Sequence, residues 1–341
     1  MMLKYLIPFV ISFLLSVFFM AVTVYFSKRV ELQGRKSKRH IHKKEISRIG
    51  GVAMIITFNL AVLINNDLVI TSEICGMMVA SLIIMVLGLW DDIKEIYWKT
   101  QLFFQIAISV LIFIFGIRIY YITNPLTGGI LNLDSGFRII ISIGLVIFWV
   151  VFVMDCINWS DGVDGLSGGI SFLSVVTIFF LSLKSEVNQP PVAILAVILA
   201  GEILGFLIFN FYPAKIMAGT SGAFFMGFAI AILAIISGTK IATSILVLVI
   251  PIVDFLWVVG ERIKNKKSIF HPDKRHLHFK LLKLGWSEKK ILLWYWGVTM
   301  LISVVALNTR AIGKVVTLAI SATIILLAFV IINKKISKGT V

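Results

Sequence analysis

Long apolar segments recur along the whole chain, and each is about the length that crosses a lipid bilayer as a helix. The sequence of 341 residues is 59% hydrophobic and only 14% charged, whereas soluble domains are about 45–50% apolar and about 25% charged. A helix needs about 20 apolar residues to cross roughly 30 Å of hydrocarbon, and the strands of a membrane barrel would be shorter and alternating. These features predict an all-α, polytopic integral membrane protein built as a helical bundle.

Eleven segments fit this description, so we expect about eleven transmembrane helices in a single transmembrane domain covering residues 1–341. No internal repeat or low-complexity region divides the chain. The first segment is not typical of a cleaved signal peptide, because its basic flank follows the apolar run instead of preceding it. The predicted spans are 3–26, 49–66, 73–90, 101–119, 137–157, 164–184, 190–210, 219–238, 241–259, 291–309 and 312–333.

The basic residues are distributed unevenly between the two sides of this arrangement. If the N-terminus lies outside, 25 of the 32 lysines and arginines fall on one side. The positive-inside rule makes that side cytoplasmic, so the N-terminus is expected outside and the C-terminus in the cytoplasm. The net charge of +15 is then explained by topology and anionic lipid headgroups, and nucleic acid is not an expected partner. The basic segments are 28–48, 91–100, 211–219, 260–290 and 333–341.

The polar clusters of the chain also fall on this predicted cytoplasmic side. They are the aspartate pair Asp91 and Asp92, the stretch CINWSDGVDGLSGG at 156–169, the glycine-rich stretch 218–222 and the histidine-containing loop 271–278. Taken singly, helix-end aspartates are often a solvated boundary, Asp-Gly pairs a tight turn, and a basic loop a lipid-facing surface. Their convergence on one face favours a shared site instead, formed by loops 28–48, 91–100, 157–163, 211–219 and 260–290.

The residue types in these clusters indicate a class of chemistry. Clustered carboxylates with an amide suit a hard ion such as Mg²⁺, which prefers oxygen ligands. Arginine, lysine and histidine bind phosphate oxygens, and glycines let the backbone approach a phosphate closely. Magnesium-assisted phosphoryl transfer needs these parts. A site at the membrane boundary predicts one water-soluble substrate and one lipid phosphate.

At these same positions the chain resembles the polyprenyl-phosphate N-acetylhexosamine-1-phosphate transferases, in glycosyltransferase family 4. The blocks that carry the resemblance occur in family order along most of the chain. They are KKEISRIGG at 43–51, GLWDD at 88–92, NWSDGVDGL at 158–166, AKIMAGTSG at 214–222 followed by FMG at 225–227, PDKRHLH at 272–278 and LLKLG at 281–285.

The resemblance implies a reaction, its partners and a location. A HexNAc-1-phosphate, GlcNAc-1-phosphate above all, would pass from a UDP-sugar to undecaprenyl or another polyprenyl phosphate, with release of UMP, as the first membrane step of a cell-surface glycan pathway. The enzyme would lie in the bacterial plasma membrane with its active site facing the cytoplasm, and it is compatible with a homodimer. The last loop looks like the branch that uses UDP-N-acetylglucosamine. The branch that uses UDP-N-acetylmuramoyl-pentapeptide has consecutive histidines there.

Residue roles follow from the family motifs. Asp91 and Asp92 match the catalytic pair, and Asp161 joins them as a catalytic and metal-binding acid. A phosphate monoester is already largely anionic at pH 7, so Asp92 is expected to orient the acceptor or the metal more than to act as a strong base. Asn158 matches an amide near Mg²⁺, for which Mn²⁺ is an alternative ion, and Asp164 is expected near the nucleotide. The candidates for diphosphate and sugar contacts are Arg48, Lys99, Arg275, His276 and His278.

Three positions depart from the family pattern. The family often has asparagine in place of Asp155 and a further histidine in place of Phe279. More seriously, a magnesium-binding aspartate of the family is replaced by Thr220. A neutral hydroxyl is a much weaker ligand for Mg²⁺ than a carboxylate. Either Asp161 or another acid completes the site, or the chain is an impaired homologue that binds lipid phosphate or nucleotide sugar.

Two other functional classes fit the sequence less well. The CDP-alcohol phosphotransferases also have Asp-Gly motifs in membrane helices, but they need more aspartates at helical spacing and an Ala-Arg pair, which this chain lacks. A transporter would favour ionisable residues near the middle of the bilayer. Here Glu202 and Asp254 are the main candidates, and Asp254 lies near the predicted cytoplasmic end of its span.

Overall fold

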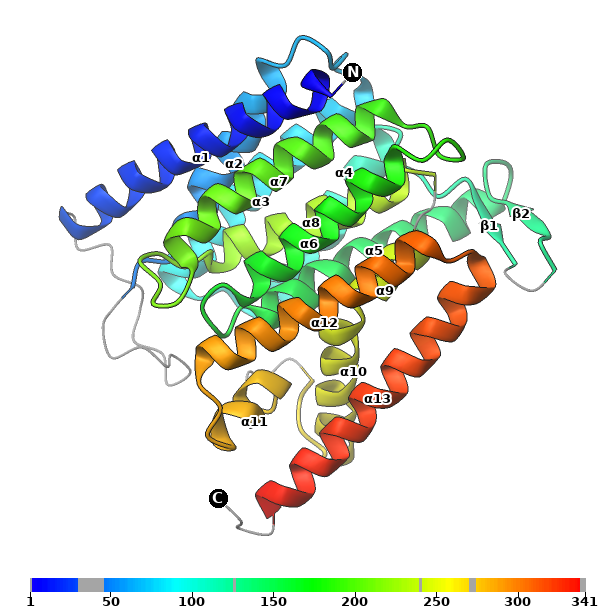
Figure 1. The fold of residues 1–341 in the computed structure, drawn as a ribbon. Helices are drawn as coiled ribbons and strands as arrows, with labels where there is room; N and C mark the ends of the chain where they lie inside the picture. The colour runs from blue at the N-terminus through cyan, green and yellow to red at the C-terminus, as the bar shows by residue number, and fades with distance from the viewer. Residues whose placement is uncertain (1, 30–45, 125–126, 239–240, 270–273, 338–341) are drawn as a thin grey trace.

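The fold is a bundle of apolar helices. The computed structural model describes residues 2–29, 46–124, 127–238, 241–269 and 274–337, and these are mostly helical (Figure 1). Seven of the described helices are long and apolar enough to cross a membrane, or eight spans if one bent pair is counted. The chain is therefore a multi-pass membrane protein. The seven are α1 (Leu3–Arg29), α3 (Ser72–Lys94), α5 (Arg138–Ser160), α7 (Pro190–Asn210), α8 (Gly219–Ile236), α12 (Glu288–Asn308) and α13 (Ala311–Ser337).

Three further apolar helices are shorter than the others. They are α2 (Gly50–Leu63), α4 (Trp98–Ile114) and α6 (Leu166–Ser182). With the bent pair, they account for a helical element in each of the eleven segments that the sequence analysis selected. A helix of 14 residues such as α2 extends only about 21 Å at 1.5 Å per residue, less than the thickness of the hydrocarbon layer. The number of complete crossings therefore remains a prediction.

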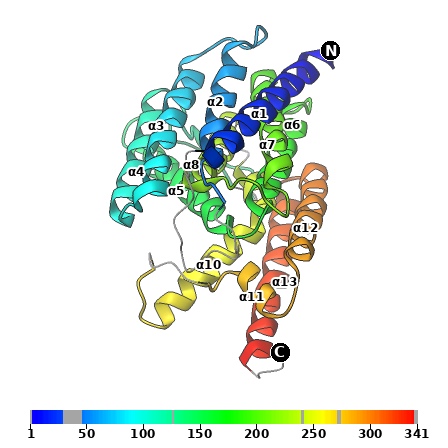
Figure 2. The same ribbon diagram turned by 90° about the vertical axis from the view of Figure 1, so that its left-hand side faces the viewer.

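The segment 241–259 is not one straight span, as the sequence analysis expected, but two helices. Helices α9 (Ile241–Val247) and α10 (Val249–Lys264) meet at an angle of 76°. Pro251 explains the break, because a proline ring clashes with the carbonyl four residues earlier, here that of Val247 at the end of α9. Figure 2 shows α10 leaving the bundle at a steep angle. The predicted loop 260–290 also contains a short helix, α11 (Leu277–Lys283).

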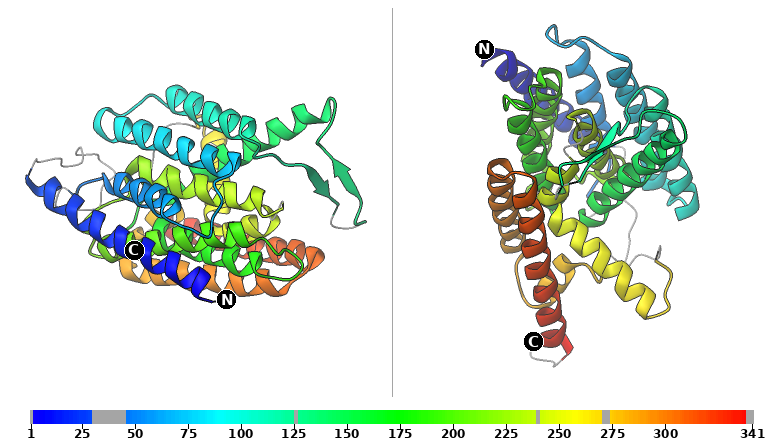
Figure 3. Two further views of the ribbon diagram at one scale, coloured as in Figure 1. Left: turned by 90° about the horizontal axis from the view of Figure 1, so that it is seen from above. Right: turned by 90° about the vertical axis from the view of Figure 1, so that its right-hand side faces the viewer.

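A short β-hairpin interrupts the expected all-α architecture between α4 and α5. Strands β1 (Tyr121–Thr123) and β2 (Ile130–Asn132) pair antiparallel, with Tyr121 opposite Asn132. The β-branched and aromatic residues in β1 suit a strand, and Gly128 has a φ of +72°, which suits the turn between the strands. Figure 3 shows the hairpin projecting beyond the helices. From the sequence, this stretch is predicted only as a connection between two spans.

Helix α8 forms the centre of the bundle. Every residue from Gly219 to Ile235 is buried, and α2, α3, α5 and α6 all pack against it. By contrast, only Ile325 and Phe329 of α13 are buried, as expected for a helix with its sides open to lipid. The N-terminal end of α8 is therefore held in place by several neighbouring helices.

Candidate functional site

The segment before α2 and the segment before α8 are joined by backbone hydrogen bonds. The amide of Met217 donates to the carbonyl of Ser47 at 2.8 Å, and the amide of Gly50 donates back to Met217 at 3.1 Å. The amide of Gly51 then donates to the carbonyl of Ala218 at 2.9 Å. These contacts fix the start of α8 beside the residue that follows Ser47, Arg48.

Two glycines allow three helix ends to approach closely at this point. A Cβ on Gly51 of α2 would lie 2.0 Å from the amide nitrogen of Gly222, and a Cβ on Gly88 of α3 would lie 2.2 Å from the Cα of Ser221. Both distances are far below van der Waals contact. The glycines bring the C-terminal end of α3, which carries Asp91 and Asp92, directly onto the first turn of α8.

Asp91 and Asp92 both bind Thr220 at the start of α8. The Thr220 hydroxyl donates to Asp91 Oδ2 at 2.6 Å, and the Thr220 amide donates to Asp92 Oδ2 at 3.0 Å. The other oxygen of Asp91 accepts hydrogen bonds from the Ile96 amide at 2.8 Å and from Gln101 Nε2 at 2.7 Å. Carboxylates at a helix N-terminus are favourably placed, because the first amides have no partner within the helix.

Arg48 connects this aspartate pair with Asp161. Its Nε atom lies 3.7 Å from Asp92 Oδ1. Burial raises the pKa of Asp161 above the usual range of an aspartate, and the Ser167 hydroxyl and the positive charge of Arg48 oppose that shift. Arg48 therefore lies between Asp92 and Asp161, whereas Asp91 joins the same site through Thr220.

Asp161 has one oxygen with no partner of its own. Ser167 Oγ donates to Asp161 Oδ1 at 2.5 Å, whereas Oδ2 is buried and has no hydrogen-bond partner among the described residues. A buried carboxylate oxygen without a partner is costly. It is the kind of atom that a bound cation or substrate would satisfy.

Asp164 and Asn210 hold the loop before α8 against the loop after α5. Asp164 is fully buried, and its Oδ2 accepts the amide of Ala214 at 2.8 Å. Asn210 accepts the amide of Gly165 at 2.9 Å and donates to the carbonyl of Ile216 at 2.8 Å. Both side chains therefore shape the backbone of the site. Asn210 is not among the predicted site residues, although its polar side chain at the end of the predicted span 190–210 is a signal that could have identified it.

The two histidines of α11 approach the site from the other side. His276 Nδ1 lies 2.9 Å from Asp254 Oδ2, which holds the start of α11 against α10. His278 is buried, and a Cβ on Gly162 would lie only 2.3 Å from its Nε2 atom, so it lies against the turn that follows Asp161. Burial, together with the nearby His276, lowers the pKa of His278 to about 3, and its imidazole is neutral at pH 7.

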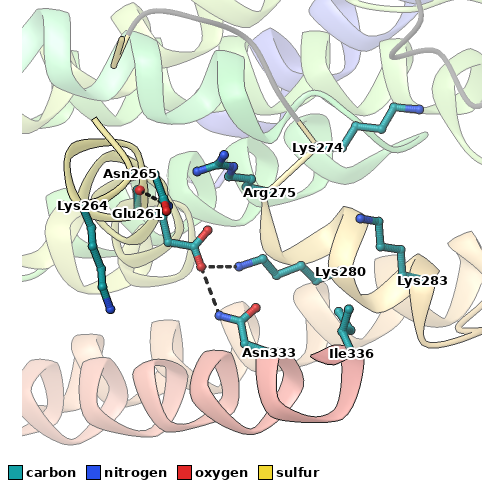
Figure 4. Close-up of a pocket in the computed structure, with 9 residues that line it drawn as sticks. All are labelled: Glu261, Lys264, Asn265, Lys274, Arg275, Lys280, Lys283, Asn333 and Ile336. Atoms are coloured by element: carbon teal, nitrogen blue, oxygen red, sulfur yellow. Dashed lines mark hydrogen bonds and ion pairs between the residues drawn. The ribbon is translucent and has the colours of Figure 1, made fainter. Parts of the chain in front are cut away.

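Two predicted substrate residues lie apart from these contacts. Lys99 is exposed on the first turn of α4, with its ammonium 5.7 Å from the ring centre of Trp98. Arg275 lines a separate cavity together with Lys280 and Glu261 (Figure 4).

An aromatic and cationic cluster near Asp161 was missed by the sequence analysis. Trp159 stacks on Phe255 with ring centres 4.3 Å apart, and the guanidinium of Arg262 lies 4.7 Å from the Trp159 ring centre. Arg262 is almost completely buried and donates to the carbonyl of Ile269. The spacing could have indicated this cluster, because Arg262 follows Phe255 by seven residues and therefore lies on the same face of α10.

The donor set partly fits a magnesium ion. In the described part of the chain, no three histidine, cysteine, aspartate or glutamate side chains come together as a metal cage. Mg²⁺ is commonly held by one or two carboxylates together with waters and substrate phosphates. The unpartnered Oδ2 of Asp161 suits the first of these roles, and Asn158 lies on the last turn of α5 before it. Thr220 directs its hydroxyl hydrogen toward Asp91, which leaves an oxygen lone pair.

Comparison with known proteins gives several relatives of similar length. The chain is 28% identical over 316 residues to a probable undecaprenyl-phosphate N-acetylglucosaminyl 1-phosphate transferase of Bacillus subtilis, which covers 90% of this chain and 86% of the relative. It is 29% identical to a decaprenyl-phosphate N-acetylglucosaminephosphotransferase of Mycobacterium leprae, over 87% of this chain and 83% of the relative. A phospho-N-acetylmuramoyl-pentapeptide-transferase of Bacillus pumilus is also 29% identical, over 89% of this chain and 96% of the relative.

The match to a known family covers much of the region that forms the site. The model of glycosyl transferase family 4 matches residues 74–238, a range that includes the aspartate pair at the end of α3, the turn with Asp161 and the first turn of α8. The relatives above align well beyond this range in both directions. By this match and by the extent of those alignments, the chain is similar to the members of glycosyl transferase family 4.

Proposed function

We propose that the chain transfers a HexNAc-1-phosphate from a UDP-sugar to a polyprenyl phosphate at the membrane surface and releases UMP. The observation that carries the proposal is the pair Asp92 and Asp161 beside Arg48, with one buried Asp161 oxygen that has no described partner. The relatives, which are named as sugar-phosphate transferases acting on polyprenyl phosphates, support it.

In this reaction an oxygen of the acceptor phosphate attacks the phosphorus that bears the sugar. A new P–O–P bond forms, the bridge between the two phosphorus atoms of the donor breaks, and its oxygen leaves with UMP. The acceptor phosphate is already anionic at pH 7, so positioning and charge neutralisation contribute most of the rate. In this proposal Arg48 binds phosphate oxygens, and Asp92, 3.7 Å from its Nε atom, holds Arg48 in position.

His278 and Asp164 take roles on the donor side of this proposal. The neutral imidazole of His278, beside Gly162, can exchange a hydrogen bond with the sugar or diphosphate without adding charge. Asp164 acts through the backbone, because it holds the amide of Ala214 in the loop that leads to Thr220. Asp164 is therefore proposed as a positioning residue for the nucleotide pocket.

The proposed cofactor is Mg²⁺, with Mn²⁺ as an alternative. Asp161 would hold it, with Asn158 and Thr220 as neutral ligands and waters or substrate phosphates completing the coordination. Bound there, the ion would neutralise charge on the diphosphate. Arg48 would then supply the remaining positive charge, and the other residues of the site would position the two substrates.

The proposed donor is UDP-N-acetylglucosamine and not the pentapeptide donor. In this chain the two histidines are separated by Leu277, whose amide donates to Asp254 Oδ1 at 2.8 Å and whose side chain is buried in the core. Only His278 of the pair lies against the turn after Asp161, because His276 is bound by Asp254. This single-histidine arrangement differs from the consecutive histidines of the pentapeptide branch.

UMP release tests the proposal. Purified protein incubated with undecaprenyl phosphate, Mg²⁺ and a panel of UDP-sugars is expected to release UMP, fastest with UDP-N-acetylglucosamine. Omission of the lipid phosphate serves as the control and should abolish release. Binding of donor or lipid with no UMP from any UDP-sugar would favour the second candidate, an impaired homologue, which the substitution at Thr220 makes a specific alternative.

The Thr220→Asp variant is expected to lower the Mg²⁺ concentration that gives half-maximal UMP release. A third carboxylate beside Asp91 and Asp92 adds negative charge at the ion site, and a carboxylate is a stronger Mg²⁺ ligand than a hydroxyl. The same variant should show a larger rise in melting temperature when Mg²⁺ is added, because the ion offsets carboxylate repulsion. Thr220→Asn is the matched neutral control and should lack both effects. Abolition of activity by Thr220→Asp at ordinary Mg²⁺ would instead mean that the site is organised around the hydroxyl.

We also propose that the site faces the cytoplasm, with the N-terminus outside, since 25 of 32 basic residues then lie inside. A cysteine introduced at Lys266, an exposed residue after α10, should react with a membrane-impermeant maleimide only after the cells are opened. Both native cysteines are first replaced by serine. Labelling of intact cells would contradict the topology.

A further inference from the structure

A basic cavity lies between the C-terminal ends of α10 and α13 and the helix α11. Its volume is about 380 Å³, and Figure 4 shows the side chains that line it. Five of the lining residues are basic, whereas one is acidic. The basic residues are Lys264, Lys274, Arg275, Lys280 and Lys283, and the acidic residue is Glu261.

The single carboxylate is already occupied within the protein. Glu261 Oε1 accepts hydrogen bonds from Trp257 Nε1 at 2.8 Å, from Lys280 Nζ at 2.9 Å and from Asn333 Nδ2 at 3.1 Å. Lys280 is buried, and its ammonium also lies 5.1 Å from the ring centre of Phe329. Glu261 therefore neutralises Lys280 and joins α10, α11 and α13. These hydrogen bonds hold one wall of the cavity in a fixed position.

Three of the other basic residues are not neutralised in this way. Lys264, Lys274 and Lys283 are exposed, and none of them forms an ion pair with a described carboxylate. A cavity of this size brings its lining charges within about a Debye length of one another, ~8 Å at physiological salt. Like charges so close repel, and a bound anion would relieve that repulsion.

The cavity is separate from the cluster around Asp161. His278 and Lys280 are two residues apart on α11, which places them about 200° apart around the helix. His278 lies against Gly162, beside Asp161, whereas Lys280 reaches Glu261. The two faces of α11 thus serve different sites, and Arg275 belongs to the one that Lys280 lines.

The position of the cavity matches the surface of the membrane. Helix α13 is apolar until Ile332 and then continues as Asn333-Lys334-Lys335, the composition of a helix that leaves the hydrocarbon layer. Asn333 and Ile336 both line the cavity. Its lysines therefore lie at the depth of lipid headgroups, where basic residues attract anionic phosphate.

We propose that this cavity binds a phosphate group, from an anionic phospholipid headgroup or from a free phosphate in solution. Lys264, Lys274 and Lys283 provide the charge from three separate segments, and Arg275 provides a planar donor pair that suits phosphate oxygens. Occupation of the cavity would link α11, whose opposite face carries His278, to the end of α13.

Native mass spectrometry of the full chain in neutral detergent tests this proposal without any measurement of turnover. Phosphatidylglycerol is the anionic probe, and phosphatidylcholine is the zwitterionic comparison. The wild type is expected to bind phosphatidylglycerol at least about tenfold more tightly than phosphatidylcholine. The double variant Lys264→Gln/Lys283→Gln should lose about tenfold in affinity for phosphatidylglycerol. The matched control Lys266→Gln/Lys267→Gln removes two charges from exposed positions beside the cavity and should bind as the wild type does.

A competition arm separates the two sources of phosphate. Displacement of phosphatidylglycerol by millimolar inorganic phosphate, with the same dependence on Lys264 and Lys283, assigns the site to phosphate itself. Failure of inorganic phosphate to compete assigns it to the lipid headgroup. Equal binding of the two lipids, or an equal loss in both double variants, would overturn the proposal. The substituted lysines are exposed, so the variants are expected to fold, and their melting temperatures verify this.

Discussion

Replacement of Asp161 by asparagine is expected to lower the rate of UMP release at least about a hundredfold, the loss seen when a key charge-stabilising group is removed from an active site. Asparagine has nearly the same shape, and its side-chain oxygen can still accept the hydrogen bond from Ser167. The variant removes the negative charge and replaces the unpartnered Oδ2 by an amide NH₂. Asp92→Asn should have an effect of similar size, because it removes the charge that holds Arg48.

Asp155→Asn is the matched control for both variants. Asp155 lies on α5, the helix that Asp161 directly follows. Its carboxylate accepts a hydrogen bond from Gln105 Nε2 at 2.8 Å, which an asparagine oxygen can also accept. This control should retain activity within a few-fold of the wild type. Initial rates at saturating Mg²⁺ provide the measurement, and elution of each variant in the position of the wild type on a sizing column verifies folding. Near wild-type rates for both Asp161→Asn and Asp92→Asn would remove these residues from the mechanism.

The second large effect is expected for Gly88→Ala, a change of one methyl group that does not touch a proposed reacting group. The added Cβ would lie 2.2 Å from the Cα and 2.3 Å from the amide nitrogen of Ser221, so α3 and the first turn of α8 must separate. Asp91 and Asp92 would then move away from Thr220. A misplacement of about 1 Å can cost about a hundredfold in rate, and we expect a loss of this size together with a lower melting temperature.

Gly144→Ala is the matched control for this steric effect. Gly144 lies within α5, and a Cβ built on it meets no described atom within 4 Å. Alanine favours a helix over glycine by about 1 kcal/mol, so the control should be as stable as the wild type or more stable, with unchanged activity. UMP release and thermal unfolding of the two variants, measured in the same detergent, provide the comparison. Equal behaviour of Gly88→Ala and Gly144→Ala would show that the contact between α3 and α8 is not tight.

The side of the membrane on which the site lies could be predicted from the sequence, because hydropathy and charge are properties of each local segment. The apolar runs defined the helices, and the basic loops assigned Asp91, Asp161 and Thr220 to one side. The structure brings Asp91 into contact with Thr220, 129 residues further along the chain, and places Arg48 beside Asp92. Three helix ends can meet this closely only if the residues at the contact have no side chain in the way. Gly51 and Gly88 meet this requirement.

Other features depended on neighbours that no local pattern identifies. Arg275, a predicted contact of the donor diphosphate, lines the cavity that Lys280 shares with Glu261. Lys99, predicted for the same role, is exposed beside Trp98. A long cationic side chain on a loop can reach several places, and the choice between them is made by the carboxylates and aromatic rings that tertiary packing brings near it.

The sequence by itself determined that this chain is a multi-pass helical membrane protein and that its polar residues gather at helix ends, because burial of charge in hydrocarbon is costly wherever it occurs. Only the tertiary structure decided the opposite roles of the two faces of α11 and the unpartnered oxygen of Asp161. Each of these depends on which helices pack together. A hydrogen-bond partner or a close contact supplied by a distant segment is a property of the assembled bundle, since the local sequence does not encode the neighbour.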